Sequence, residues 1–349
     1  MPRRFTDPVR RPCGLGLLVA GVLALAACTR PEPVRVLSGA AQGTTWQVSV
    51  WHPDGVDGAA LQQRLEAELD RIDGVLSNYR PDSVIERFNA QETTAPVAVG
   101  EEIVELVRVA RQVSEASQGC YDLTVQPLLA LWGFSGDTLT PPDAATLAQA
   151  MQRVGFAKLE IQPPGSLRKL APGVHADLSS IAQGYSVGRL AAVVEAAGID
   201  NYLVELGGEL QARGHKPGDA PWRIGVERPA PGGGAVERVL TLRAEAPVAV
   251  MTSGTYRHYF DAEGKRYSHI LDARTGAPVT HNTVSVTVVD SDPTRADAWS
   301  TALLCLGREA GVAVADGHGI AALFIAESSG GFEETATAAW RSLTTIEVD

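Results

Sequence analysis

Apolar residues recur at helical spacing in two segments of the first third of the chain. In the first segment, spacings of three or four residues connect Leu61, Leu65, Leu69, Ile72 and Leu76. Residues 103–117 repeat the pattern with isoleucine, valine and alanine. Because side chains three and four residues apart share one face of a helix, we predict helices over 61–75 and 103–117.

Two later helices are indicated by the residues at their ends. An apolar-periodic run opens with Asp-Leu-Ser-Ser at 177–180 and stops at Gly198, which is typical of a capped helix with a glycine after its end. Asp292 offers a second N-cap, and Pro293 follows it at the first helical position. This last helix is expected to run to residue 306 and to stop before Gly307.

Strand patterns dominate the second half of the chain. They are rich in β-branched and aromatic residues and cover residues 202–206, 222–226, 239–242, 248–252 and 284–289. Glycine- and proline-rich segments at 214–221 and 229–234 are predicted to be surface loops. Helices and strands do not alternate strictly, which favours an α+β fold, in one compact unit over residues 39–349.

The first residues of the chain differ from the rest. Four arginines precede an apolar run of 14 residues, from Gly14 to Ala27, which ends at Cys28 in the sequence Leu-Ala-Ala-Cys. The run is shorter than the roughly 20 residues that span a bilayer, so a signal peptide over 1–27 is favoured over a short membrane anchor. Leu-Ala-Ala-Cys resembles the lipobox of bacterial lipoproteins, which makes Cys28 the expected lipidation site and 28–38 a tether. We therefore expect a protein anchored to a membrane of the bacterial cell envelope, on its extracytoplasmic (periplasmic) face.

Charge and cysteine content narrow the classes of partner. Removal of residues 1–27 removes four arginines and one aspartate, so the formal net charge changes from −11 to −14. Such a charge argues against nucleic acid as a partner. Besides Cys28, only Cys120 and Cys305 remain, so no disulfide framework is required, although one bridge between them is open. No cysteine and histidine cluster of the kind that binds zinc is present.

The densest group of chemically active residues lies at 252–256 and 267–276. Small hydroxyl residues and glycines there accompany His269 and Asp272, which suits close approach to a ligand and proton transfer. A hairpin with its turn at 261–264 is the alternative, and His269 would then be an ordinary strand histidine.

A second group lies on the predicted last helix. Asp297 and Thr301 are four residues apart, so a carboxylate and a hydroxyl project from one face. Hard oxygen ligands suit Mg²⁺, which takes few protein ligands and completes its shell with water and phosphate. The alternative is a hydrogen bond from Thr301 back to its own helix.

Two further segments could contact a ligand. The first amides of the helix that opens at 177–180 form an anion site suited to a pyrophosphate. Gly207-Gly208 permits close approach but is equally typical of a plain turn. Tyr79 could stack on an aromatic ring or lie in the core.

Taken together and in order, these segments resemble the ApbE family of FAD:protein FMN transferases, whose older members were described as thiamine-biosynthesis lipoproteins. The matching blocks cover nearly all of the chain after the tether: residues 43–46, 76–89, 121–134, 177–185, 206–208, 252–256, 268–276 and 285–302. The resemblance implies a single ApbE-like, T-fold-related domain with antiparallel or mixed sheets and flanking helices.

The resemblance also implies roles for individual residues. The metal ligands would be the Ser180 carbonyl, Asp297 and Thr301, and His269 would be the group closest to proton transfer. FAD would contact a larger set, in which Tyr79 stacks on the isoalloxazine: Gln42, Tyr79, Cys120, Tyr121, Asp122, Asp177, Gln183 and Leu271. The same cleft would be lined by Gly208, Ser253 and Gly254.

The implied reaction is magnesium-dependent. A threonine or serine hydroxyl of an acceptor protein attacks the FMN-side phosphorus of FAD, AMP leaves, and His269 accepts the proton. Asp272 would orient that histidine or bind metal. The expected acceptor is a membrane-associated redox subunit or a flavin-carrier domain. Two rival hypotheses are an FAD pyrophosphatase, with water as acceptor, and a flavin-binding lipoprotein without turnover.

The chain departs from the family pattern at four positions. Gln183 stands where many members have lysine, and Gly188 stands where an acidic residue is frequent. Ala273 follows Asp272 where proline is common, and Ser300 replaces a second acid that some members carry. The last change is expected to weaken metal affinity.

Overall fold

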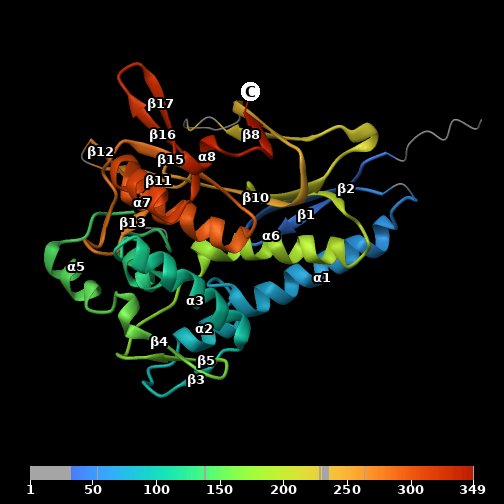
Figure 1. Ribbon diagram of the computed structural model, residues 1–349. Helices are drawn as coiled ribbons and strands as arrows, with labels where there is room; N and C mark the ends of the chain where they lie inside the picture. Colours follow the sequence, from blue (N-terminus) through green and yellow to red (C-terminus); the bar gives the residue numbers. More distant parts are fainter. Residues whose placement is uncertain are drawn as a thin grey trace, which may run out of the picture. The chain divides into compact units, whose positions relative to one another are not determined.

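The frame of the fold is a large antiparallel sheet, seen from one edge in Figure 1. The computed structural model describes residues 33–52, 54–136, 139–227, 229, 236–262 and 264–348. Among these residues, eight strands pair in the spatial order β1 (Arg35–Ala41), β2 (Thr44–Trp51), β6 (Asn201–Leu206), β7 (Glu209–Gly214), β10 (Ala244–Gly254), β15 (Thr283–Asp290), β16 (Ala321–Ser328) and β17 (Gly331–Ala336). Every neighbouring pair is antiparallel.

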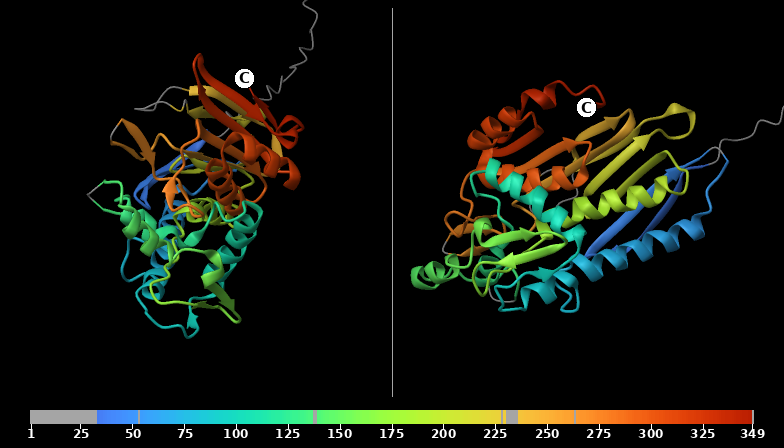
Figure 2. Two further views of the ribbon diagram at one scale, coloured as in Figure 1. Left: turned by 90° about the vertical axis from the view of Figure 1, so that its left-hand side faces the viewer. Right: turned by 60° about the horizontal axis from the view of Figure 1, so that its bottom comes forward.

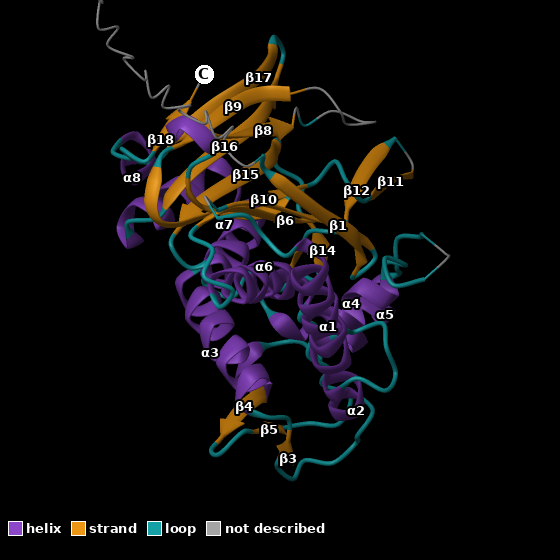
Figure 3. Cartoon of the chain, turned by 90° about the vertical axis from the view of Figure 1, so that its right-hand side faces the viewer, coloured by secondary structure: helices purple, strands orange, loops and turns teal. Residues whose placement is uncertain are grey.

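Helices cover one face of this sheet. The long ones are α1 (Gly58–Leu76), α3 (Glu101–Ala116), α6 (Ser179–Glu195) and α7 (Pro293–His318). The apolar side of α1 and alternate residues of β2, such as Val48, pack into the same core, as their periods of 3.6 and 2 require. Figure 2 shows α1 and α6 side by side along the sheet, and Figure 3 shows α1, α3, α6 and α7 gathered on one side of it.

A smaller sheet covers the opposite face. It contains β8 (Trp222–Glu227), β9 (Val236–Leu242) and β18 (Ile346–Val348), with the short helix α8 (Ala338–Arg341) beside it. Trp222 and Leu240 pack there against Leu210 and Leu323 of the large sheet. The large sheet is therefore covered on both faces, which explains why seven of the eight residues of β15 are buried, its serine and threonines included.

The remaining elements are short and lie near the helical side. They include α2 (Val84–Asn89), α4 (Gln126–Leu131), α5 (Ala144–Met151), the sheet of β3 (Val97–Ala98), β5 (Ser166–Lys169) and β4 (Leu159–Gln162), and the hairpins β11 (Tyr259–Ala262)–β12 (Lys265–Ser268) and β13 (Leu271–Asp272)–β14 (Ala277–Pro278). Three single 3₁₀ turns cover Leu123–Val125, Phe156–Lys158 and Pro217–Asp219. The α+β prediction, the five strand predictions and the first three helix predictions are confirmed.

The last helix differs from its prediction. Gly307 has φ 74° and ψ 174°, so the helical path breaks there, but it resumes and α7 ends only at His318. The break is held by a hydrogen bond from the Arg308 amide to Thr283 Oγ1 at 2.8 Å. A Cβ at Gly307 would lie 2.6 Å from the His281 ring, so glycine serves both the backbone angle and the packing. The prediction that the helix ends before Gly307 is wrong because this glycine interrupts the helix and does not cap it.

The amino-terminal boundary also differs. Strand β1 begins at Arg35, so residues 35–38, expected in the tether, belong to the sheet. Leu37 is buried and pairs with Val48, which explains why the segment is ordered. The chain forms a compact unit from Glu32 to Asp349. The signal peptide and Cys28 lie outside the described residues, as does most of the loop at 229–234.

None of the helices in the described ranges is both long and apolar enough to cross a bilayer.

Candidate active site

A cavity of about 280 Å³ opens where the amino-terminal end of α6, the helix α7 and the end of β10 meet. Most of the residues singled out from the sequence line it: Tyr79, Cys120, Tyr121, Asp122, Asp177, Ser180, Gln183, Ser253, Gly254, His269, Leu271, Asp297 and Thr301. A second cavity of about 580 Å³ shares Tyr79 and Gln183 with the first and includes Gln42. The two cavities together form one cleft along the start of α6.

The start of α6 is fixed by local hydrogen bonds. Asp177 accepts hydrogen bonds from the backbone amide and the hydroxyl of Ser179, and the amide of Leu178 donates to Asn78 Oδ1 at 2.8 Å. Asp177 is buried, and burial raises its pKa. Ser180 Oγ lies 3.2 Å from the hydroxyl of Tyr121 across the cavity. The amides of Ser179, Ile181 and Ala182 in this first turn already donate to Asp177 Oδ1 and to the Leu178 carbonyl oxygen, so they are not free for the pyrophosphate that the sequence predicted there.

Helices α6 and α7 approach each other closely at Gly184. A Cβ at this position would collide with the carbonyl oxygen of Pro293 and lie 2.6 Å from Asp297 Cβ. The Gly184 amide donates to Asp297 Oδ2 at 2.8 Å. This contact brings Ser180, one turn earlier on α6, and Asp297 to the same cavity, although 117 positions separate them in the sequence.

The donor groups around Asp297 fit a magnesium ion. Asp297 is 5% exposed, and its second oxygen, Oδ1, has no hydrogen bond among the described residues. Burial raises the pKa of Asp297 to about 7. Thr301 Oγ1 lies 3.0 Å from Ser253 Oγ, which also contacts Ser300 Oγ at 2.8 Å. A buried carboxylate beside neutral oxygen donors, on a cleft open to phosphate, is a donor set that Mg²⁺ accepts.

His269 directly follows β12, so the hairpin alternative is correct for the backbone, and the histidine still reaches the cavity. Its amide donates to the His258 carbonyl oxygen at 3.0 Å, and its Nδ1 lies 2.9 Å from the same oxygen. Since a carbonyl only accepts, Nδ1 carries the proton and Nε2 is the basic nitrogen. Burial lowers the pKa of His269 to about 4, so the imidazole is neutral near pH 7 and can accept a proton.

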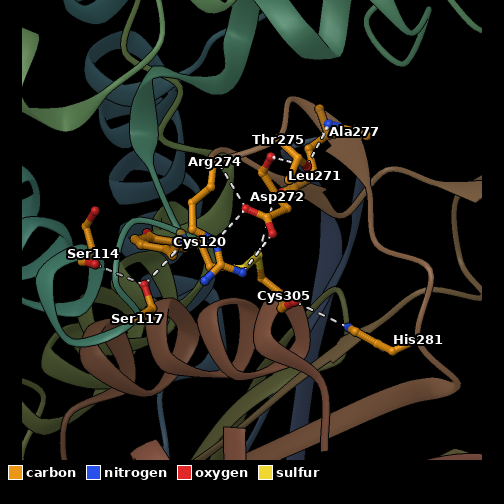
Figure 4. Close-up of a disulfide and its surroundings, with 11 residues drawn as sticks. Ser114, Ser117, Cys120, Leu271, Asp272, Arg274, Thr275, Ala277, His281 and Cys305 are labelled. Atoms are coloured by element: carbon orange, nitrogen blue, oxygen red, sulfur yellow. Dashed lines mark hydrogen bonds and ion pairs between the residues drawn. A yellow bond between two sulfur atoms is a disulfide. The ribbon is translucent and has the colours of Figure 1, made fainter. Parts of the chain in front are cut away.

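Asp272 has a different position from the one expected. Its Oδ1 accepts from Arg274 Nε at 2.9 Å and its Oδ2 accepts from Arg274 Nη2 at 2.7 Å, as Figure 4 shows. Asp272 is not part of the cavity wall. The suggestion that it orients His269 is therefore wrong, because the His258 carbonyl has that position. Gly208 is also outside the wall: it lies beside the guanidinium of Arg257.

Cys120 and Cys305 form a disulfide, with their Cα atoms 6.0 Å apart. Both cysteines line the cavity, and the bridge joins the segment before the 3₁₀ turn Leu123–Val125 to α7. Arg274 Nη2 lies 3.4 Å from Cys120 Sγ, so the guanidinium that pairs with Asp272 also contacts the disulfide (Figure 4). The bridge that the cysteine count left open is thus present, and it forms part of the wall of the site.

Two other positions separate alternatives that the sequence left open. Tyr79 is 84% exposed, so it is not a core tyrosine, and its ring is available at the junction of the two cavities. Asp122 is buried, and both of its oxygens are occupied, by Thr124 and by the Phe156 amide. Its carboxylate therefore shapes the cavity wall and has no free oxygen for a ligand.

Sequence reasoning missed Glu209 and Arg257, which also line the cavity. Glu209 is the first residue of β7 and is only 7% exposed; its Oε2 accepts from the Thr252 amide at 3.0 Å. The negative charge of Asp297 and burial both raise the pKa of Glu209, burial more strongly. Arg257 Nη1 donates to the Gly207 carbonyl oxygen at 3.0 Å. An acid directly after Gly207-Gly208 was a signal available in the sequence.

Comparison with known proteins agrees with this geometry. The model of the ApbE family matches residues 42–324. Among curated relatives, an FAD:protein FMN transferase of Klebsiella pneumoniae is 37% identical over 303 residues, which cover 85% of this chain and 86% of the relative. The FAD:protein FMN transferase of Escherichia coli K12 is 33% identical and covers 91% of this chain and 93% of the relative.

Solved structures give the same result. The apo flavinyl transferase ApbE of Pseudomonas stutzeri superposes with a TM-score of 0.81 at 39% identity and covers 90% of this chain and 98% of that one. The flavin transferase ApbE of Vibrio cholerae superposes with a TM-score of 0.80 at 35% identity, over 88% of this chain and 99% of that one. The family match spans well over half of the chain, and each of these relatives is covered over most of its own length. The chain therefore belongs to the ApbE family.

Proposed function

We propose that this protein transfers FMN from FAD to a threonine or serine hydroxyl of an acceptor protein and releases AMP, with magnesium at Asp297. The names of its relatives support flavin transfer. The observation that carries the proposal is one cavity wall that contains a neutral histidine and a buried carboxylate with a free oxygen. A proton acceptor and a cation site on one cavity wall suit the transfer of a phosphorus-bound group.

The residues divide the chemistry between them. The side chain of Gln183 faces the pyrophosphate, and Tyr79 stacks on the flavin. Magnesium, held by Asp297, Thr301 and the Ser180 carbonyl, would neutralise charge on the phosphates. The acceptor oxygen forms a bond to the FMN phosphorus, and the bond from that phosphorus to the bridging oxygen breaks. AMP leaves with the bridging oxygen, and His269 Nε2 takes the acceptor proton.

We also propose that the enzyme works on the extracytoplasmic side of a membrane, anchored through a lipid on Cys28. The Cys120–Cys305 disulfide supports this location, because such bridges persist in oxidising compartments and are rare in the cytosol. A tether raises the local concentration of the enzyme near a membrane-bound redox subunit, which is the acceptor that we favour.

One experiment separates this function from its rivals. Residues 29–349 are incubated with FAD, Mg²⁺ and a flavin-carrier domain that bears an acceptor threonine, and intact mass and AMP are measured. We expect the carrier to gain the mass of one FMN, with one AMP released per carrier, and a carrier with alanine at the acceptor position to gain nothing. AMP with free FMN would instead establish a pyrophosphatase, and FAD binding without either product would establish a binding protein.

A further inference from the structure

Glu209 is a second buried carboxylate on the wall that contains Asp297. It is the first residue of β7 and directly follows the glycine pair at 207–208, which turns the chain into the cavity. Its exposed fraction of 7% is close to the 5% of Asp297. Burying a charged carboxylate is costly unless a cation or several hydrogen bonds compensate. Two such groups on one cavity therefore require an explanation.

The hydrogen bonds of Glu209 satisfy only one of its oxygens. Oε2 accepts from the Thr252 amide at 3.0 Å, while Oε1 has no hydrogen bond among the described residues. Among the described residues, Oε1 is not one of the solvent-inaccessible polar atoms that lack a hydrogen-bond partner, which agrees with its place on the cavity wall. The carboxylate is thus held by one oxygen, and the other is available to a ligand in the cavity.

Arg257 does not neutralise this charge by direct contact. Its guanidinium donates to the Gly207 carbonyl oxygen and pairs with Glu227 Oε2 at 3.5 Å. Within the described ranges, no ion pair joins Arg257 to Glu209. Among the described residues, no cationic side chain therefore forms an ion pair with Glu209.

Within the described residues, helix α7 supplies only one carboxylate to the cavity wall, that of Asp297. Ser300, next to Thr301, is uncharged and fully buried, and its hydroxyl is engaged with Ser253 Oγ and the Asp297 carbonyl oxygen. Magnesium usually binds one or two carboxylates in proteins. With Ser300 at this position, the second one can come from β7.

We propose that Glu209 is the second carboxylate of the magnesium centre, with Oε2 fixed by the Thr252 amide and Oε1 available to the metal. The inference rests on the proposed function, since it presupposes the metal at Asp297. It assigns to β7 a part of the metal site that the sequence placed wholly on α6 and α7.

The test measures metal binding apart from turnover. Glu209→Gln keeps the shape of the side chain and an oxygen for the Thr252 amide but removes the charge. Binding of Mn²⁺ is followed by electron paramagnetic resonance, and Mg²⁺ by competition, with FAD present and no acceptor protein. We expect the metal Kd to rise by about tenfold or more, as loss of a group that supports a metal site typically does.

Glu205→Gln is the matched control. Glu205 lies on the neighbouring strand β6, pairs in register with Leu210, and accepts from the Gly208 amide at 2.6 Å, but it does not line the cavity. The metal Kd of Glu205→Gln should equal that of the parent protein. Thermal melting of both variants checks that the fold is retained. A purely structural role of Glu209 would lower the melting temperature and leave the metal Kd unchanged, which would overturn the inference.

A second variant tests the inference by rescue of metal affinity, because it carries the same Glu209→Gln change. Glu209→Gln with Ser300→Asp returns the carboxylate to the neighbouring α7 position, where some family members carry an acid. We expect the double variant to recover metal affinity. If Glu209→Gln binds Mn²⁺ like the parent protein while FMN transfer proceeds, only this inference fails. If the parent protein binds no metal, the metal part of the proposed function fails with it.

Discussion

The Cys120–Cys305 disulfide should contribute a large share of the stability of the protein. The bridge connects residues 185 positions apart, and in the chain-entropy account closing so long a loop costs the unfolded state about 5 kcal/mol at 25 °C. Domains are stable by only about 5–15 kcal/mol, so this loss is considerable. With an unfolding entropy of about 2.1 cal/mol/K per residue over the ordered unit, 5 kcal/mol corresponds to roughly 8 °C in Tm.

The assay compares residues 29–349 with the double variant Cys120→Ser/Cys305→Ser of the same fragment, since residues 29–349 contain no other cysteine. Circular dichroism melts are recorded for each protein with and without dithiothreitol, and thiol titration counts free cysteines. Reduction should lower the Tm of the parent protein by roughly 8 °C and leave that of the double variant unchanged. The reduced parent and the double variant should melt at similar temperatures.

Two results would refute the reasoning. Two free thiols in the untreated parent protein would show that the bridge does not form. An unchanged Tm after full reduction would show that the bridge does not constrain the unfolded chain as calculated. Because both cysteines line the cavity, we further expect reduction to weaken FAD binding, measured by fluorescence titration below the melting range.

The remaining predictions concern single residues of the site. Asp297→Ala should abolish magnesium-dependent AMP release while circular dichroism shows a retained fold; full activity would contradict the metal assignment. His269→Asn should lower kcat more than it raises the FAD Kd. The folded-state pKa of His269 is lowered from about 6.5 to about 4, so the unfolded chain takes up the proton first, and stability is lost as pH falls through this window. Urea unfolding at pH 7 and 5 should therefore show a smaller loss in His269→Asn than in the parent protein. Gly184→Ala should destabilise by about 2 kcal/mol or more in urea unfolding, because its Cβ meets the Pro293 carbonyl, and should weaken Mn²⁺ binding. Tyr79→Ala should raise the FAD Kd about tenfold without a change in Tm, since the ring is 84% exposed; an unchanged Kd would exclude stacking.

Local patterns predicted the elements of this fold well because burial is periodic. The strand β15 and the helix α1 each carry enough apolar residues to be recognised from their spacing alone. The sheet of β3, β5 and β4 was not predicted, since its strands have only two to four residues and β3 pairs with a strand far along the chain, β5. Gly307 was misjudged because a glycine that breaks a helix and one that ends it look alike in sequence.

The site followed a similar division. His269 and Asp297 were found because they lie in segments that resemble those of a known family. Asp297 and Ser180 reach the same cavity because Gly184 lets α6 and α7 touch. Glu209 was missed because glutamate at a strand end is usually exposed, and only the tertiary fold buries it. Asp272, to which the sequence assigned a catalytic role, instead forms an ion pair with Arg274, two residues away in a local turn.

The proposed metal ligands and the proposed proton acceptor belong to different packing units. Asp297 lies between buried residues of the main core, whereas the hairpin that precedes His269 packs with α4 and α5 in a separate apolar cluster around Trp132 and Phe260. Native proteins open locally in cooperative units, each with its own free energy. We therefore expect the hairpin to open more readily than α7. In hydrogen exchange, the amides of β11 and β12 would then exchange as one group, faster than those of α7.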